Sequence, residues 1–270
     1  MNETLFRYTE SDFKITHTRT AHPLDNMEMH THGHYEVYFF LSGECHYLVE
    51  GTQYALSPGD IMIMRPFETH KCVVHSSDVP YERIICTVTE KFLLDISGGS
   101  SLLQAFRSRP LGVANHFCDL DFGHTLCSDS LQTMIQREPD ISREEMISRV
   151  FLILCEIKRV TEQITPHTRT DTIANRIIDY VNSNLYTPLS LEILSKEFFL
   201  SKSQINRIFK SNTGSSVGKY IAIKRLLSAR QMIRAGESVA TAASKCGYRD
   251  YSVFYRAYKN QFGVSPQKDR

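Results

Sequence analysis

The chain has 270 residues, of which 41% are hydrophobic and 23% charged, an ordinary composition for a folded protein with room for two cores. It contains no apolar run near the ~20 residues that span a bilayer, and acidic residues stand where a signal peptide is basic. The seven cysteines are scattered, without a CxxC pair. We therefore expect a cytoplasmic protein with no membrane partner, disulfide framework or zinc knuckle.

The formal net charge of +1 conceals an uneven distribution along the chain. Residues 171–270 contain sixteen Lys and Arg against seven Asp and Glu, a formal charge of +9. Residues 1–170 contain fifteen against twenty-three, a formal charge of −8. Because phosphates attract a basic segment and repel an acidic one, this split predicts a nucleic-acid-binding domain behind a domain that stays off the nucleic acid.

Short β-branched and aromatic runs occupy the chain from about Ile15 to about Val88 and predict a sandwich or barrel of strands. The runs are YEVYFFL, HYLVEG, IMIM, KCVVH and RIICTV, separated by turns that contain Gly or Pro. Beyond them we expect a loop at 97–100 and a short helix from Leu102 that ends before Pro110. Residues 111–140 are expected to be mostly loop, with one helix around 131–135.

Residues 142–164 predict a long helix with an apolar seam. The seam consists of Met146, Val150, Ile153, Ile157, Val160 and Ile164, which recur at alternating steps of four and three. Such a seam packs one helix on another in a dimer, or docks on the barrel of its own chain. We favour the dimer slightly. The polar residues that follow, with Pro166, predict a linker.

Residues 171–270 predict two helix-turn-helix motifs in series, joined by a long helix over 216–235. Helix starts are expected at Asp171, Ser190, Ser201, Ser238 and Asp250, with Gln204 completing a capping box at Ser201 and Gly214 ending that helix. A connecting helix of this length spans ~30 Å, close to the ~34 Å between successive major-groove faces of a duplex. Both motifs of one chain would therefore contact adjacent major grooves.

The last helix of each motif is amphipathic. Ile205, Ile208 and Phe209 are expected to pack inward in the first motif, and Val253, Phe254 and Tyr258 in the second. The outward residues are candidates for DNA binding: Lys202, Ser203, Asn206, Arg207, Lys210, Tyr251, Ser252, Tyr255, Arg256 and Lys259. Arg207 is the strongest candidate to bind a guanine, with a phosphate contact as its alternative. Lys224 is expected to be a phosphate-positioning or solvated charge.

An extended residue pattern runs through this segment: Phe209-Lys210, Thr213-Gly214, Arg225-Leu226, Ala229, Gly247-Tyr248, Asp250, Phe254, Arg256, Lys259, Gly263, Ser265-Pro266 and Arg270. It resembles the AraC/XylS family of transcription regulators. The resemblance implies a bipartite helix-turn-helix domain that binds promoter DNA, usually as an activator, with RNA polymerase as a partner. The chain departs from the family pattern at Ser195, Ala242 and Asp269, and Ala242 is expected to thin the core of the second motif.

A second set of residues resembles the two motifs of the cupin superfamily: His30-Thr31-His32, Glu36, Gly43, Pro58-Gly59-Asp60, Pro66 and His70. This resemblance implies a small jelly-roll barrel. His30, His32, Glu36 and Tyr38 share a parity, so one strand would direct them to one face, and His70 would join from a neighbouring strand.

These five residues are our candidates for effector binding. His30, His32, Glu36 and His70 also form a competent ligand set for a divalent metal such as zinc, iron or manganese. We favour a metal-free cluster that lines a sugar-binding cavity, where Tyr38, Phe40, Tyr47 and Met64 would supply stacking and apolar contacts. No cofactor is expected beyond that possible metal.

The sequence thus predicts an α+β multidomain chain. Residues 1–110 would form a ligand-sensing jelly-roll (cupin) barrel, 111–165 a helical dimerisation segment, 166–170 a linker and 171–270 an all-α double helix-turn-helix domain. The predicted function is that of a homodimeric regulator that binds double-stranded promoter DNA and responds to a sugar-like small molecule. No nucleophile, P-loop or dinucleotide fingerprint is visible, so no enzyme is expected. Two alternatives stay open: a cupin metalloenzyme fused to a DNA-binding module, and a dimeric regulator that needs no ligand.

Overall fold

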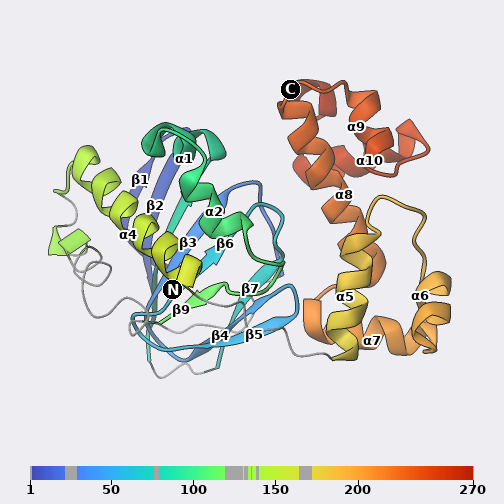
Figure 1. Cartoon of the computed structure of the whole chain (residues 1–270), viewed down its shortest axis with the longest axis horizontal. Helices are drawn as coiled ribbons and strands as arrows, with labels where there is room; N and C mark the ends of the chain where they lie inside the picture. Colours follow the sequence, from blue (N-terminus) through green and yellow to red (C-terminus); the bar gives the residue numbers. More distant parts are fainter. Residues whose placement is uncertain are drawn as a thin grey trace. The chain divides into compact units, whose positions relative to one another are not determined.

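The computed structural model describes residues 2–21, 29–75, 79–118, 140–163 and 172–269, with 130, 133, 134, 136 and 137 in addition. It divides into an amino-terminal unit, Met1–Met27 with His34–Arg169, and a carboxy-terminal unit, Glu28–Gly33 with Thr170–Arg270. Within the described residues the first unit holds the β-strands and the second is helical (Figure 1). The expected α+β chain is confirmed. Most of the expected helix at 131–135 and the linker at 166–170 lie outside the described residues.

The amino-terminal unit contains two antiparallel sheets. The larger runs in the order β1 (Asn2–Thr9), β2 (Phe13–Thr20), β8 (Tyr81–Val88), β3 (Tyr35–Ser42), β6 (Ile61–Met64) and β9 (His116–Phe117). The smaller runs in the order β5 (Thr52–Leu56), β4 (Cys45–Val49) and β7 (His70–Val74). The five apolar runs fall on β3, β4, β6, β7 and β8, as predicted. None of the five runs covers β1, β2, β5 or β9, of which β1 and β5 are edge strands rich in polar residues.

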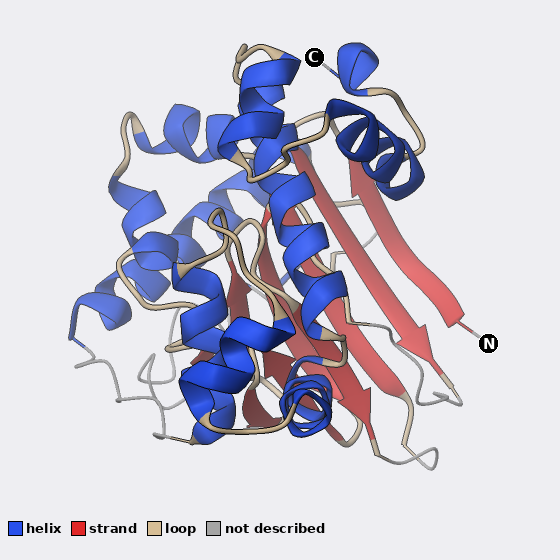
Figure 2. Cartoon of the chain, turned by 90° about the vertical axis from the view of Figure 1, so that its right-hand side faces the viewer, coloured by secondary structure: helices blue, strands red, loops and turns tan. Residues whose placement is uncertain are grey.

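Strand β3 has both faces buried, which explains why its sequence is almost continuously apolar. Tyr35, Val37 and Phe39 belong to the core beneath the helices, whereas Tyr38 and Phe40 belong to the core between the two sheets. Figure 2 shows the strands of the larger sheet side by side. The larger sheet is therefore the middle layer of this unit.

Helices α1 (Glu90–Ser97), α2 (Ser101–Arg107) and α4 (Arg143–Gln163) supply the outer layer. The seam of α4 is at most 4% exposed along Met146, Val150, Ile153, Ile157 and Val160, and it belongs to the same core as β3 and β8. The favoured interpretation of this seam as a dimer interface was wrong, because the chain's own sheet already covers it. Another copy would have to use the opposite face of α4, where Leu152 is 40% exposed.

A buried ion pair ties the loop after α2 to the sheets. Arg109 donates to both carboxylate oxygens of Glu68, at 2.8 and 2.7 Å, and neither side chain is more than 1% exposed. The Gly112 amide and the Asn115 side chain also donate to this carboxylate, at 2.9 and 3.1 Å. Burial by itself would raise the pKa of Glu68, but the Arg109 charge and these hydrogen bonds lower it to about 2.

The carboxy-terminal unit contains the two expected helix-turn-helix motifs. The first comprises α5 (Ile173–Ser183), α6 (Leu191–Phe198) and α7 (Lys202–Thr213), and the second α9 (Val239–Lys245), α10 (Tyr251–Phe262) and the 3-10 helix η2 (Pro266–Asp269). Helix α8 (Val217–Arg234) joins them. The predicted caps at Ser190, Ser201, Ser238 and Asp250 are confirmed, as is the capping box with Gln204. The first cap is Thr172, not Asp171, because the Thr172 hydroxyl accepts the Asn175 amide.

Each motif has its own apolar core. Ile205 and Phe209 anchor α7 in one core, and Phe254 and Tyr258 anchor α10 in the other. Val253 was expected to pack inward but is 48% exposed, because the register that buries Phe254 and Tyr258 turns it about 100° away.

Lys224 was expected to lie at the surface but is 4% exposed. Its ammonium lies 5.2 Å from the centre of the Tyr220 ring, which provides a cation–π contact in this buried position. The Lys224 side chain therefore lies in the interior of the carboxy-terminal unit and offers no exposed charge for a phosphate.

The departure at Asp269 has a structural role. Its carboxylate accepts hydrogen bonds from Arg230 at 2.6 Å, from Arg234 at 2.5 Å and from the Tyr258 hydroxyl at 2.9 Å. Burial opposes the charged form, but Arg230, Arg234 and Tyr258 lower the pKa of Asp269 overall. Asp269 thus fastens η2 to both α8 and α10.

Candidate nucleic-acid interface and ligand site

Helix α7 presents the first set of DNA-binding candidates. Ser203, Arg207 and Lys210 are exposed along one side of the helix, opposite the buried Ile205 and Phe209. This exposure follows because Ile205 and Phe209 pack into the core of the first motif, which directs the side chains on the opposite side of the helix outward.

Two of the α7 candidates already have contacts within the protein. Asn206 is half-buried, and its side-chain oxygen accepts the Val217 amide at 3.4 Å, at the start of α8. Lys202 forms an ion pair with Glu192 of α6, so its charge is partly neutralised before any phosphate arrives. Of these residues, Arg207 therefore offers a full positive charge together with a planar set of donors.

Helix α10 presents the second set. Ser252, Arg256 and Lys259 are exposed, Tyr251 is 42% exposed, and Tyr255 is half-buried with its ring 6.3 Å from that of Tyr251. The Arg256 Nε donates to the Ser252 carbonyl oxygen at 3.4 Å, within the same helix. This leaves the guanidinium at the surface and does not brace it against another part of the domain.

The core between the two sheets is unusually rich in hydroxyl groups. Tyr38, Tyr47 and Tyr81 are at most 3% exposed, and the hydroxyls of Tyr38 and Tyr81 are hydrogen-bonded at 2.9 Å. The rings of Tyr38 and Tyr47 lie 4.9 Å apart. Burial raises the pKa of all three hydroxyls well above the ordinary value, so they stay neutral and keep both donor and acceptor capacity.

Glu36 and His70 face each other inside the same core. They are 5% and 0% exposed, and His70 Nε2 lies 3.9 Å from a Glu36 carboxylate oxygen. His70 Nδ1 donates to the Glu68 carbonyl oxygen at 2.7 Å, which fixes the orientation of the ring. His70 comes from β7 in the opposite sheet, not from a strand next to β3.

The expectation that one strand carries His30, His32, Glu36 and Tyr38 on one face was wrong, because β3 begins only at Tyr35. Glu36 and Tyr38 do share a face, but His30 and His32 precede the strand in Glu28–Gly33, which belongs to the carboxy-terminal unit. The metal-ligand set of His30, His32, Glu36 and His70 stays a prediction.

Sequence reasoning missed Arg83, the cation of this core. It is 8% exposed, with its guanidinium carbon 4.4 Å from the centre of the Tyr81 ring and one nitrogen 3.1 Å from the Thr20 hydroxyl. The available signal was its position: in β8, Arg83 shares the parity of Tyr81, so both side chains lie on the side that faces the smaller sheet.

Comparison with known proteins connects both units to one family. Residues 13–137 match the AraC-like ligand binding domain, and residues 194–270 match a helix-turn-helix domain. The multiple antibiotic resistance protein MarA of Escherichia coli is 33% identical over 114 residues, which cover 42% of this chain and 84% of MarA. The chain belongs to the AraC family.

Similarity to other proteins extends along the whole regulator. The transcriptional activator RhaS of Escherichia fergusonii is 24% identical over 251 residues, which cover 89% of this chain and 86% of RhaS. The crystal structure of ToxT from Vibrio cholerae aligns at a TM-score of 0.41 and 14% identity, covering 96% of this chain and 97% of ToxT. The resemblance stated from the sequence is confirmed. This regulator consists of a ligand-binding domain and a helix-turn-helix DNA-binding domain, and its family is one of transcription regulators, not of enzymes.

A helix long and apolar enough to cross a bilayer is absent from the described part of the regulator.

Proposed function

We propose that this AraC-family regulator binds two adjacent major grooves of promoter DNA through α7 and α10, and that it activates transcription when a carbohydrate occupies the core between its sheets. The observation that carries the proposal is that one compact unit exposes two helices with outward cations, joined by the 18-residue α8. Helix α8 is about 27 Å long, which suits two motifs on one side of a duplex.

The DNA part rests on the charge and exposure of the two helices. The candidates on α7 and α10 stay those predicted from the sequence, with Arg207 and Arg256 as base-reading residues and Lys210 and Lys259 as phosphate contacts. A guanidinium can donate to O6 and N7 of guanine together, whereas an ammonium acts as a point charge. Arginine therefore supplies selectivity and lysine supplies affinity.

Replacing Arg207 by Ala is expected to weaken binding to the preferred site by about 1–3 kcal/mol and to relax selectivity at one base position. Lys210→Ala is the matched control on the same exposed side of α7 and is expected to weaken all sequences evenly. The measurement is selection from a randomised duplex library followed by competition binding at fixed salt. Equal weakening on every sequence by Arg207→Ala would show that Arg207 contacts only phosphate.

The effector part rests on the polar groups in the core between the sheets. Tyr38, Tyr81, Glu36, His70 and Arg83 place hydroxyls, a carboxylate, an imidazole and a guanidinium among apolar residues. Carbohydrates are bound by this combination of hydrogen-bonding groups and aromatic rings. We extend the same role to His30 and His32.

A thermal-shift screen with monosaccharides and small aromatic acids tests the effector. A ligand at 100 times its Kd stabilises the regulator by about 2.7 kcal/mol, enough to raise its Tm by several degrees. Tyr38→Phe, which removes one hydroxyl from the core, is expected to reduce that shift, and Tyr180→Phe in the other unit is the matched control. A shift that Tyr38→Phe leaves unchanged would place the ligand elsewhere, and metal with turnover in the purified regulator would favour a metalloenzyme.

We further propose that the regulator works in the cytoplasm as a homodimer that contacts RNA polymerase at the promoter. Since the apolar seam of α4 is covered by its own sheet, the outer face around Leu152 is the part of this helix left for a second copy. Sedimentation of Leu152→Glu against the unchanged regulator measures whether that face joins the two copies.

A further inference from the structure

We propose that Arg225 is a latch between the two helix-turn-helix motifs, and that this latch sets the spacing of DNA half-sites that the regulator accepts. The inference rests on the proposed function, because it assigns a role to the geometry that separates α7 from α10. Arg225 lies on α8, and within the described residues its hydrogen bonds go to Leu185, Thr187 and Gly247 and not to a DNA candidate. It is therefore a positioning residue, which acts through the angle between the two motifs.

The guanidinium of Arg225 bonds to both motifs at once. Its Nε donates to the Leu185 carbonyl oxygen at 2.7 Å, and one terminal nitrogen donates to the Thr187 carbonyl oxygen at 2.7 Å, both in the loop between α5 and α6. The other terminal nitrogen points to the Gly247 carbonyl oxygen at 3.4 Å, in the turn between α9 and α10. A planar group with fixed donors holds three acceptors in one geometry, which a lysine cannot do.

Gly247 lets the second motif approach the first closely. Its φ of +82° lies in the left-handed region, and a Cβ placed there would be 3.0 Å from the Tyr186 carbonyl oxygen and 3.1 Å from the guanidinium carbon of Arg225. The Tyr186 hydroxyl also bonds to Ser228 of α8 at 2.8 Å. The α5–α6 loop, α8 and the α9–α10 turn therefore meet around a single side chain.

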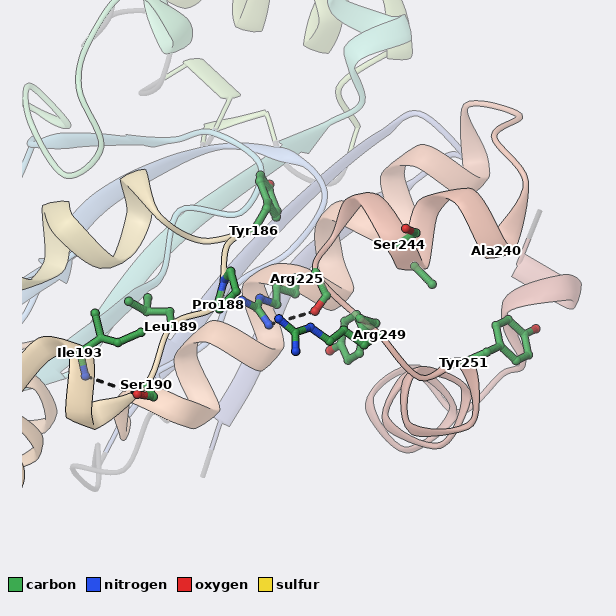
Figure 3. A pocket seen from close by; sticks show the side chains of 13 residues that line it. Tyr186, Pro188, Leu189, Ser190, Ile193, Arg225, Ala240, Ser244, Arg249 and Tyr251 are labelled. Carbon is green, nitrogen blue, oxygen red and sulfur yellow. Dashed lines mark hydrogen bonds between the residues drawn. The ribbon is translucent and has the colours of Figure 1, made fainter.

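Apolar packing does not perform this task, because the cores of the two motifs are separate clusters. A pocket of about 820 Å³ lies between the motifs, with Pro188 and Ile193 on one side and Ala240 and Ser244 on the other. Figure 3 shows the guanidinium of Arg225 in the wall of this pocket, bonded to the turn that precedes Tyr251. Polar contacts around Arg225 thus hold two bodies that have open space between them.

The consequence for DNA follows from the geometry of the duplex. Inserting one base pair between two half-sites moves the second one by about 3.4 Å and rotates it by about 35°. A rigid pair of motifs loses one set of base contacts on such a duplex, whereas a loosened pair reorients and keeps both. The latch therefore converts the angle between the motifs into a preference for one spacing.

The experiment uses the full-length regulator and a randomised 40-base-pair duplex library, from which selection yields the half-sites and their spacing. Affinities are then measured on that duplex, on duplexes with one base pair inserted or deleted between the half-sites, and on duplexes that keep one half-site. The variants are Arg225→Lys, which keeps the charge, and Gly247→Ala, which forces the same contact apart. Arg249→Ala is the matched control, because Arg249 lines the same pocket and no hydrogen bond ties it to either motif within the described residues.

The unchanged regulator is expected to lose at least about tenfold in affinity on the shifted duplexes, the cost of about one mismatched base pair. Arg225→Lys and Gly247→Ala are expected to reduce that ratio below about threefold, with binding to single half-sites unchanged, and Arg249→Ala to retain it. The ratio does not depend on the active fraction, so partial unfolding alone does not change it. A tenfold ratio retained by both variants overturns the latch and leaves the proposed function intact. A library from which the unchanged regulator selects no sequence overturns the proposed function, and the latch with it.

Discussion

Replacing Arg109 by Ala is expected to destabilise the amino-terminal unit by about 3–5 kcal/mol, because the Glu68 carboxylate is then buried without its counter-charge. Both side chains are at most 1% exposed, so water cannot replace the lost partner. The same change releases the loop at Val113, whose carbonyl oxygen accepts from Arg109 at 3.1 Å. The loss is measured as the change in the free energy of unfolding in urea. Unfolding is followed by far-ultraviolet circular dichroism, because the chain contains no tryptophan.

Lys91→Ala is the control for this prediction, since Lys91 and Asp95 form an exposed pair with 71% and 60% of their side chains accessible. Exposed pairs contribute about 0–1 kcal/mol, so that variant is expected to unfold almost as the unchanged regulator does. Equal effects of Arg109→Ala and Lys91→Ala would show that the loop relaxes and lets water reach Glu68.

The same pair predicts how stability depends on pH. The folded pKa of Glu68 is about 2, below its ordinary value of 4.5, so the folded carboxylate binds its proton less readily than the unfolded one. Its contribution is therefore complete above pH 4.5 and is lost as the pH falls towards 2. Glu68→Gln is expected to flatten the fall in unfolding free energy over this range, and parallel curves for the two proteins would contradict the assignment.

Replacing Phe254 by Ala is expected to cost about 3–5 kcal/mol in the second helix-turn-helix motif. Phe254 is fully buried in a core that includes Ala229, Ala242 and Ala243, and these small side chains cannot fill the cavity that its removal leaves. Because that core is separate from the first, α10 should lose its position while α7 keeps its own. Two measurements test this difference. Hydrogen exchange of the α9–α10 amides should become faster, and nuclease footprinting should show that one DNA half-site loses its protection while the other keeps it.

Phe209→Ala is the matched variant, since Phe209 is 1% exposed and anchors α7 in the core of the first motif. It is expected to remove protection of the other half-site. Simultaneous loss of both half-sites in each variant would show that the two motifs fold as one cooperative body, despite their separate cores.

The expected caps were correct in the carboxy-terminal unit because caps are local. A hydroxyl or carboxylate such as that of Ser238 or Asp250 needs only the amides two or three residues ahead, so nearby residues decide the outcome. Asp171 failed as the first cap because Thr172, one residue later, performs the same chemistry. The double motif and the family could therefore be predicted without the fold.

The candidate ligand site was predicted only in part, for a physical reason. Parity places Glu36 and Tyr38 on one face, but it does not say where a strand begins, and β3 begins after His30 and His32. Nor does it say that the smaller sheet supplies the opposite wall with His70, or that β8, next to β3 in the larger sheet, adds Tyr81 and Arg83 to the same face.

The sequence by itself determined the two basic helix-turn-helix motifs, the strand-rich acidic half and the residues exposed on α7, since local hydrogen bonds and periodicity decide these features. The tertiary structure alone decided that the seam of α4 packs on its own sheet, that Lys224 is buried, and that Arg109 pairs with Glu68. It alone also decided that Arg225 joins the two motifs. The packing of the α4 seam, the Arg109–Glu68 pair and the contacts of Arg225 join residues far apart in the chain, and a one-dimensional pattern shows which residues can form such contacts but not which partner each one meets.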